Sequence, residues 1–573
     1  MRAALPGRTA ALLAALTLGS VLLHAQTSRS PVADAAMGKD LAQVRQLLKS
    51  GADANASQGD GMSALHWAAL NGDAGMAEML LVAGANVRAT TRIGAFTALH
   101  LAAQAGRDAA VPALIKAGTP LDATTATGAT ALMLAAASGN ATLVDQLAAA
   151  GAALDLTETA HGQTALMFAA ANGRTEAVKA LLARGARLGL TSRVVDLSKV
   201  EVPEEVLQDQ ARQEQRPQAG TAAPPARSQP SGIAGMTRPF KYNELIGKHG
   251  GLTALHFAAR QGAFDTAKAL IEAGADVNAV SAGDHSSPMV IAAINGHFDL
   301  VLYLLSKGGD PNLAAENGMT PLYEVVNMQW QPKSFYPQPR AYLQQKASYL
   351  EVMQALLDKG ADPNARTTKK IWYTQYNFDL LRVDDQGATP FWRAAYASDI
   401  EAMKLLVKYG ADPTIPTAKP AVNDRFRQGG VRSADESRDH SGLPPVPTGG
   451  PDIPPLLAAS GAGYGEGFAG NAHRFAPTGM LAAVKYLVEE LGTDPNARDA
   501  DGNTALHHAA SRGDNEMISY LVSKGADVTL VNRGGQTTVD MANGPVQRVQ
   551  PFPETIKLLE GLGAKNNHKC VSC

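Results

Sequence analysis

A short phrase of polar, apolar and small residues recurs along most of the chain. It reads Ser-Ala-Leu-His-Trp-Ala-Ala from Ser63 and Thr-Ala-Leu-His-Leu-Ala-Ala from Thr97. The leucine position of the first four copies falls at Leu65, Leu99, Leu132 and Leu166. Further copies begin at Thr253, Ser287, Thr320, Thr389, Pro454, Thr504 and Thr537. A fixed period of about 33 residues indicates an array of stacked repeats.

Each period contains the signals for two short helices. The leading Thr or Ser can cap a helix N-terminus, and where proline follows, as at Pro321 and Pro390, its missing N–H costs nothing. A glycine such as Gly72 ends this first helix. The second helix carries a pair of leucines, for example Leu80-Leu81, and closes with Gly-Ala-Asp before an extended turn.

These residues resemble those of the ankyrin-repeat family. The matching features are the Thr-x-Leu-His-x-Ala-Ala phrase, the mid-repeat glycine and the Gly-Ala-Asp-x-Asn close, as at Gly274–Asn278. The resemblance covers most of residues 31–565 in about twelve units, including degenerate ends. It implies an all-α solenoid of two-helix units with projecting β-turn fingers. It also implies a binding role on the concave face of fingers and inner helices, and no common catalytic residue.

The first 25 residues have the layout of a secretory signal peptide. Arg2 and Arg8 precede the apolar run Thr9–Leu23, and Ala25 is a small residue suited to cleavage. The run of about 15 residues is short for a membrane span of about 20. An uncleaved N-terminal anchor is the alternative. No later segment reaches 18 apolar residues, so we expect a secreted or periplasmic protein of bacterial type, without a membrane span in the mature chain.

Insertions interrupt the repeat period. Residues 191–248 are rich in Gln, Pro and Ala, which predicts a flexible linker between an N-terminal lobe (31–190) and a C-terminal lobe (249–565). Alternatively this segment folds back over the solenoid, with Pro239–Tyr242 as the piece most able to dock. The C-terminal lobe has insertions near 327–348, 366–386, 415–452 and 461–478, and a tail follows at 566–573. Insertions in a solenoid form loops that often belong to the binding face.

Aromatic residues are concentrated in two of these insertions. Fourteen of the 30 in the chain lie between Tyr323 and Tyr409. Trp and Tyr dominate binding hot spots, so we predict that the insertions hold a protein or peptide partner. The candidate binding residues are Trp330, Phe335, Tyr336, Tyr342, Trp372, Tyr373, Tyr376 and Phe378. Alternatively these side chains form a small core that fixes the long loops to the solenoid, and the two roles are compatible.

Composition and charge narrow the class of function. Hydrophobic residues make up 45% of the chain, which is enough for a core, and 51 Lys+Arg balance 53 Asp+Glu. A chain with so little net charge lacks the positive electrostatic field that attracts nucleic acid or an anionic membrane. No insertion carries Ser, His and Asp, or paired carboxylates, at a spacing typical of catalysis. We therefore expect a binding scaffold without enzymatic activity, metal or cofactor.

Histidines and cysteines are the remaining candidates for chemistry. The histidine of the phrase, as in His66, is expected to hydrogen-bond within and between turns, since Met133 and Met167 replace it in other copies. Cys570 and Cys573 are the only cysteines, and their spacing fits a disulfide, a redox pair or a metal half-site.

The same cysteine pair also resembles the start of a haem-attachment motif, in which a histidine follows the second cysteine. In this sequence no histidine follows Cys573, so haem binding is not supported. A disulfide or inert tail is the expected role of the pair. A truncated motif in an electron-transfer protein is the alternative.

Overall fold

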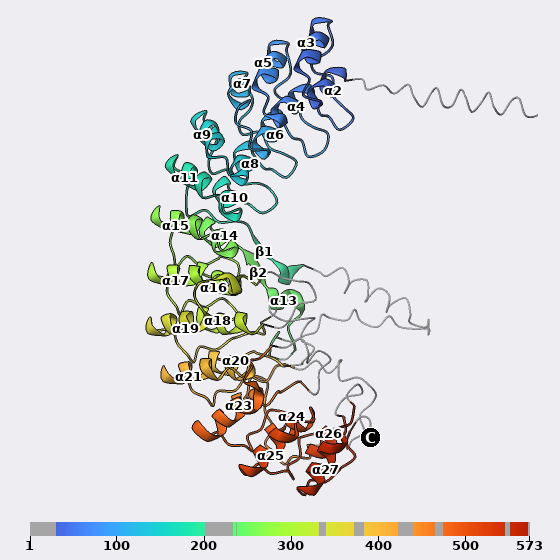
Figure 1. The fold of residues 1–573 in the computed structure, drawn as a ribbon, viewed down its shortest axis with the longest axis vertical. Helices are drawn as coiled ribbons and strands as arrows, with labels where there is room; N and C mark the ends of the chain where they lie inside the picture. The colour runs from blue at the N-terminus through green and yellow to red at the C-terminus, as the bar shows by residue number, and fades with distance from the viewer. Residues whose placement is uncertain are drawn as a thin grey trace, which may run out of the picture. The chain divides into compact units, whose positions relative to one another are not determined.

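The described part of the chain folds into paired helices. The computed structural model describes residues 30–200, 233–236, 238–331, 340–371, 383–421, 439–464, 474–544 and 550–570. These residues form twelve helical hairpins, each an inner helix followed by an outer helix, and one short strand pair (Figure 1). The all-α solenoid predicted from the repeat is confirmed. No helix within the described ranges is both long and apolar enough to cross a bilayer.

The chain divides into two compact units. Unit 1 runs to Arg193 and adds residues 253–258 and 263–275, while unit 2 comprises the remainder. The helices of unit 1 are α2 (Pro31–Met37), α3 (Leu41–Lys49), α4 (Ala64–Asn71), α5 (Ala74–Val82), α6 (Ala98–Gln104), α7 (Val111–Lys116), α8 (Ala131–Ser138), α9 (Ala141–Ala149), α10 (Ala165–Ala171), α11 (Thr175–Ala183) and α15 (Phe264–Glu272). The helix α14 (Ala254–Gln261) contributes to both units. Inner helices α4, α6, α8 and α10 pack against one another in order.

Unit 2 holds the remaining repeats and all the long insertions. Its helices are α13 (Tyr242–Ile246), α16 (Pro288–Ile294), α17 (Phe298–Ser306), α18 (Pro321–Gln329), α19 (Tyr349–Asp358), α20 (Pro390–Tyr396), α21 (Ile400–Lys408), α22 (Pro455–Ala459), α23 (Gly479–Lys485), α24 (Ala505–Ala510), α25 (Asn515–Ser523), α26 (Thr538–Ala542) and α27 (Pro553–Gly561). Short 3₁₀ turns η1 (Leu197–Lys199) and η2 (Ala341–Gln344) and a π-helical turn η4 (Tyr486–Glu490) complete the set. The insertion after α18 separates it from its partner α19, as the broken period predicts.

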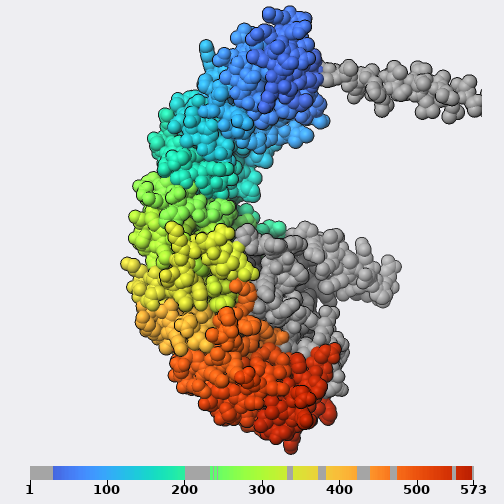
Figure 2. All heavy atoms as spheres, viewed as in Figure 1, coloured from blue at the N-terminus to red at the C-terminus, as the bar shows by residue number. Residues whose placement is uncertain are grey.

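The predicted capping signals define the helix ends. The Thr97 hydroxyl accepts the His100 N–H, and Thr320 caps α18 in the same way with Pro321 at the first helical position. Gly72 and Gly139 end α4 and α8 in the left-handed conformation that glycine adopts without strain. The paired alanines of the phrase are fully buried, which lets neighbouring helices approach closely. In the space-filling view of Figure 2, successive hairpins within each unit abut on the face shown.

The phrase histidine has the predicted structural role. Nδ1 of His66 lies 3.1 Å from the Ser63 backbone nitrogen, whose N–H it accepts. Its Nε2 lies 3.1 Å from the carbonyl oxygens of Ala89 and Phe96 in the following turn. Burial lowers the pKa of His66, which favours the neutral imidazole that this donor–acceptor arrangement requires.

The two ends of the predicted linker form ordered elements in unit 2. Strand β1 (Val194–Asp196) pairs antiparallel with β2 (Lys248–Gly250), with Val195 opposite His249. The Leu197 N–H then donates to the Gly247 carbonyl at 3.0 Å, and α13 packs on η1. Residues 201–232 and residue 237 lie outside the described residues. We call residues 194–200 and 238–250 the linker anchor.

Candidate functional site

Three successive turns of unit 2, which we call fingers, are fixed at their bases by a ladder of asparagines. The first finger is 276–286, the second 310–319, and the described part of the third is 362–371 with 383–388. Asn278 donates its side-chain N–H to the Gly308 carbonyl at 3.0 Å and accepts the Asp310 N–H at 2.8 Å. Asn312 bonds the Gly360 carbonyl and the Asp362 N–H in the same way, both at 2.8 Å. The asparagine that ends each close, Gly-Ala-Asp-x-Asn at Asn278 and Gly-Gly-Asp-x-Asn at Asn312, therefore sets the position of the next finger.

Backbone hydrogen bonds join the same fingers near their tips. The Glu316 N–H donates to the Asp284 carbonyl at 2.7 Å, and the Thr368 N–H donates to the Asn317 carbonyl at 2.8 Å. Gly318 has φ +80°, and a Cβ at this position would lie 2.5 Å from the Arg366 carbonyl oxygen. Glycine here lets the third finger approach the second.

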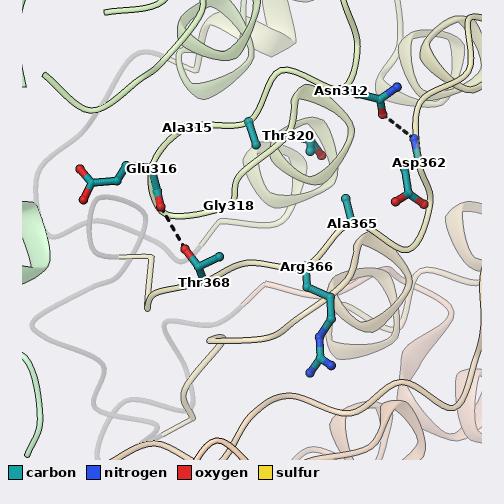
Figure 3. Close-up of a pocket in the computed structure, with 10 residues that line it drawn as sticks. Asn312, Ala315, Glu316, Gly318, Thr320, Asp362, Ala365, Arg366 and Thr368 are labelled. Atoms are coloured by element: carbon teal, nitrogen blue, oxygen red, sulfur yellow. Dashed lines mark hydrogen bonds between the residues drawn. The ribbon is translucent and has the colours of Figure 1, made fainter. Parts of the chain in front are cut away.

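A cavity of about 490 Å³ lies between the second and third fingers (Figure 3). It is lined by Asn312, Ala314, Ala315, Glu316, Gly318, Thr320, Asp362, Ala365, Arg366 and Thr368. The dashed bonds in Figure 3 join Asn312 to Asp362 and Glu316 to Thr368, so each pair connects the two fingers across the cavity edge. Much of the lining consists of small side chains, which leave finger backbone accessible.

A second cavity, of about 460 Å³, lies on the other side of the second finger. It is lined by Asp196, Ser198, Glu244, Gly247, Lys248, Ala282, Gly283, His285, Ala314, Ala315, Glu316 and Lys369. Because Ala314, Ala315 and Glu316 line both cavities, the two adjoin at the second finger. We call the combined depression the finger groove. One of its walls is the linker anchor.

An ion pair stiffens the anchor wall. The guanidinium of Arg238 lies 2.6 Å from the Glu244 carboxylate, and both side chains are about one-fifth exposed. Glu244 also accepts the Lys241 N–H at 2.9 Å. The hydrogen bond from Arg238 is the main cause that lowers the pKa of Glu244 to about 2. This carboxylate is therefore ionised at any physiological pH.

A second ion pair connects the fingers to the anchor. Nζ of Lys369, on the third finger, lies 2.8 Å from Oε1 of Glu316 on the second. The same ammonium lies 5.7 Å from the centroid of the Phe240 ring, a cation–π distance. Phe240 belongs to the segment that the sequence marks as the piece most able to dock. Lys369 thus holds two fingers and the anchor in one arrangement.

The chemistry of the groove suits binding more than reaction. Its amides, carbonyls and hydroxyls can hydrogen-bond an extended peptide, and Glu244, Glu316 and Lys369 already have partners of opposite charge. Within the described residues no group of three His, Cys, Asp or Glu side chains is placed to hold a metal.

Two of the predicted aromatic binding residues are buried inside unit 2. Trp330 is 8% exposed, and its indole N–H donates to Oδ2 of Asp399 at 2.7 Å. Tyr342 is 6% exposed, stacks near Phe298 with ring centroids 6.2 Å apart, and accepts a 2.6 Å hydrogen bond from Arg474. Both side chains therefore fix the insertions to the solenoid, in agreement with the alternative that the aromatic residues form a small core, and their burial contradicts the prediction that these two residues contact a partner.

The other predicted residues cannot be placed in the same way. Phe335, Tyr336, Trp372, Tyr373, Tyr376 and Phe378 all lie outside the described residues, and their binding role stays a prediction. Cys570 is disulfide-bonded, while Cys573 lies outside the described residues. The redox role of the cysteine pair also stays a prediction.

Sequence reasoning missed the residues that line the finger groove. Glu316 and Lys369 are 53 residues apart, and Arg238 lies in a segment whose composition indicates a loop. The one available signal is the Pro239–Tyr242 stretch, which marks where the insertion returns to the solenoid. Charged pairs at such separations have no periodic signature in a single sequence.

Comparison with protein families supports the repeat assignment. A model of ankyrin repeats in three copies matches residues 32–125, 99–192 and 255–331. A second model, of ankyrin repeats in many copies, matches residues 472–522, and a single-repeat model matches residues 386–418. Together these matches include more than half of the chain.

Several curated proteins are similar to parts of this chain. Alpha-latrocrustotoxin-Lt1a of Latrodectus tredecimguttatus is 25% identical over 261 residues, which cover 45% of this chain and 13% of that protein. The E3 ubiquitin-protein ligase KEG of Arabidopsis thaliana is 26% identical over 326 residues, covering 51% and 18%. Ankyrin repeat and SAM domain-containing protein 6 of Rattus norvegicus is 39% identical over 85 residues, covering 15% and 9%. The chain spans less than a fifth of the length of each of these relatives.

Proposed function

Because the chain belongs to the ankyrin-repeat family, we propose that it is a scaffold that binds a protein or peptide partner and catalyses no reaction itself. The finger groove of unit 2 is the proposed binding site. The observation that carries this assignment is the pair of adjoining cavities, of about 490 and 460 Å³, on the second finger. Their lining combines small side chains, accessible backbone and charged side chains from three parts of the chain.

The finger groove is preorganised to bind an extended segment of the partner. Asparagine bonds fix the finger bases, backbone bonds fix the tips, and the Lys369–Glu316 ion pair fixes the distance between two fingers. A partner that enters this groove does not have to order the fingers itself, which reduces the entropy cost of binding. The aromatic residues predicted at Trp372 and Tyr373 follow the third finger's described part and remain proposed contributors.

A bulky side chain in the groove should block the partner. Ala314 lines both cavities and is half-buried, so Ala314→Arg should fill the groove without disturbing the core. The full chain serves as bait in an extract of the source organism, and captured proteins are identified by mass spectrometry. We expect capture to fall at least about tenfold in the variant, the result of losing roughly 1.4 kcal/mol or more of binding free energy.

The matched control is Ser57→Arg, at the corresponding finger position of unit 1, where the side chain is exposed. It should leave capture unchanged. An equal fall of partner capture in both variants would indicate a general effect of the added charge. Unchanged capture by Ala314→Arg would contradict the proposal that the finger groove is the binding site. Trp372→Ala combined with Tyr373→Ala tests the aromatic contribution separately, with helical content measured by circular dichroism.

We also propose that the protein is exported. The support is the N-terminal sequence alone: two arginines, an apolar run and Ala25. N-terminal sequencing of the protein from its source should give a mature chain that begins after Ala25. A cytoplasmic fraction that holds the chain with residues 1–25 intact would contradict export.

A further inference from the structure

One position of the repeat phrase is ionisable and buried in two neighbouring repeats of unit 2. It is the residue directly after the phrase histidine on the inner helix. In most repeats of both units this residue is apolar, as at Trp67, Phe168 and Ile291. On α18 and α20 it is Glu324 and Arg393, which are 0% and 4% exposed. Two ionisable side chains have thus replaced apolar residues at a place closed to solvent.

Glu324 and Arg393 are bridged by a single amide. Nδ2 of Asn327 lies 3.3 Å from Oε2 of Glu324, and the Arg393 Nε–H donates to Oδ1 of Asn327 at 2.9 Å. The Arg393 Nη2–H donates to the Trp330 carbonyl at 3.0 Å. Both ionisable side chains therefore contact the same amide, that of Asn327, between α18 and α20.

Within the part of the chain that the structure describes, three buried polar atoms of this cluster have no hydrogen-bond partner. They are Oε1 of Glu324, Nη1 of Arg393 and the hydroxyl of Tyr323, the residue that takes the place of the phrase histidine on α18. Tyr323 is 1% exposed. An unpaired buried polar atom is destabilising and uncommon in a folded protein, so three in one cluster point to an occupant that would pair with them.

The charge balance indicates the nature of that occupant. No carboxylate of the described residues lies within ion-pair distance of Arg393. Burial raises the pKa of Glu324 to about 8, so this acid is mostly neutral at pH 7 and does not compensate the guanidinium. A buried guanidinium without a counter-ion is costly, and an anion at this point would remove the cost. The further acids nearby, Asp384 and Asp385, belong to the third finger, where Oδ1 of Asp385 accepts the Ile371 N–H at 2.9 Å.

We propose that the cluster of Tyr323, Glu324 and Arg393 is a binding site for a small organic carboxylate. One carboxylate oxygen accepts from Arg393 Nη1–H, and the pair of oxygens also accepts the Tyr323 hydroxyl and the acid proton of Glu324. All three unpaired atoms then have a partner, and the guanidinium has a counter-ion. This site is separate from the finger groove.

Acetate is the probe, with acetamide as the neutral molecule of the same shape. Binding to the full chain is followed by the change in thermal midpoint at constant ionic strength, by ¹³C-acetate NMR and by hydrogen exchange of α18 and α20. We expect acetate, and not acetamide, to raise the midpoint and to slow exchange in these two helices. A short peptide with a free C-terminal carboxylate, compared with its amidated form, tests whether the carboxylate comes from a chain end.

Two variants assign the effect to the cluster. Tyr323→Phe removes only a hydroxyl that has no partner, so it should keep the fold and weaken acetate binding several-fold. Arg393→Lys keeps the charge and loses the fork of donors, and should weaken binding at least about tenfold. An equal response to acetate and chloride, absence of any response in the wild-type chain, or unchanged acetate binding in both variants would overturn the proposal.

Discussion

Asp399→Ala should unfold unit 2 at a markedly lower temperature than the wild-type chain. Asp399 is 2% exposed and stands at the start of α21, where Oδ1 accepts the Ala402 N–H at 3.1 Å. Its other oxygen, Oδ2, accepts the Trp330 indole N–H at 2.7 Å and the Tyr349 hydroxyl at 2.8 Å. One side chain therefore caps a helix and accepts hydrogen bonds from a buried indole and a half-buried tyrosine hydroxyl in the preceding repeat and its insertion.

The expected loss is about 3–5 kcal/mol in the free energy of unfolding. Removing a helix cap costs about 1 kcal/mol, and each buried donor left without an acceptor adds about 1–3 kcal/mol. Because stability in a stacked array depends on neighbouring interfaces, the loss should appear in unit 2 first. Urea unfolding followed by tryptophan fluorescence and by hydrogen exchange of each unit measures it.

Ser348→Ala is the matched control in the same unit. Ser348 caps α19 and is exposed, so its loss removes a cap without leaving a buried donor unsatisfied. We expect a loss of about 1 kcal/mol. A similar small effect in Asp399→Ala would mean that the hydrogen bonds to Trp330 and Tyr349 contribute little.

The local features of the fold could be predicted from the sequence. The Thr caps, the prolines at the first helical position and the glycines that end helices act over four residues or fewer, so each copy of the phrase contains the complete signal. The asparagine of the Gly-Ala-Asp-x-Asn close is also visible in the sequence. Its role depends on the following finger, where Asn278 accepts the Asp310 N–H, and this contact has no signature in the sequence.

The sequence left two roles open for the aromatic residues, partner binding and a small core, because the burial of each side chain depends on distant partners. Trp330 is buried through a hydrogen bond to a residue 69 positions later, and Tyr342 through one to Arg474, which is 132 positions later. Sequence composition distinguishes an aromatic loop from a polar one. It does not distinguish an aromatic side chain that faces solvent from one that another insertion covers.

The sequence marks Pro239–Tyr242 as able to dock, but the strand pairing and the ion pair of the linker anchor could not be predicted. Antiparallel pairing of β1 with β2 uses backbone groups, so it requires no particular side chains over three residues. The Gln-, Pro- and Ala-rich composition of 191–248 describes the middle of the insertion and hides its two ends. Arg238 and Glu244, which form an ion pair, are six residues apart within a segment that has no repeat counterpart.

The second large effect concerns the buried acid. Burial raises the pKa of Glu324 from 4.5 to about 8, against the opposing influence of Arg393 and Asn327. The folded chain therefore holds a proton that the unfolded chain releases above pH 4.5. The contribution of Glu324 to the free energy of unfolding is fully present below pH 4.5. It is lost as pH rises toward 8. We expect unit 2 to be less stable at pH 8 than at pH 6.5.

The window from pH 6.5 to 8 reduces the influence of the histidines. Burial lowers the pKa of His507 to about 4, so the stability from this neutral histidine rises through the unfolded pKa of 6.5 and opposes the loss from Glu324 only in the lower part of the window. Over the 1.5 pH units of the window, Glu324 should remove roughly 2 kcal/mol of stability, since each unit corresponds to about 1.4 kcal/mol. Asp452, whose pKa burial raises to about 7, adds a smaller loss of the same sign in the lower part of the window.

Glu324→Gln should flatten this pH dependence, because the amide keeps an acceptor for Asn327 and has no proton to lose. Urea unfolding of unit 2 at pH 6.5, 7.25 and 8 measures the difference. Glu401→Gln, at an exposed position on α21, is the control and should keep the wild-type slope. The residual slope in Glu324→Gln should disappear when Asp452→Asn is added. If the wild-type chain keeps its stability from pH 6.5 to 8, Glu324 is ionised in the folded state, and Arg393 then has its counter-ion within the chain.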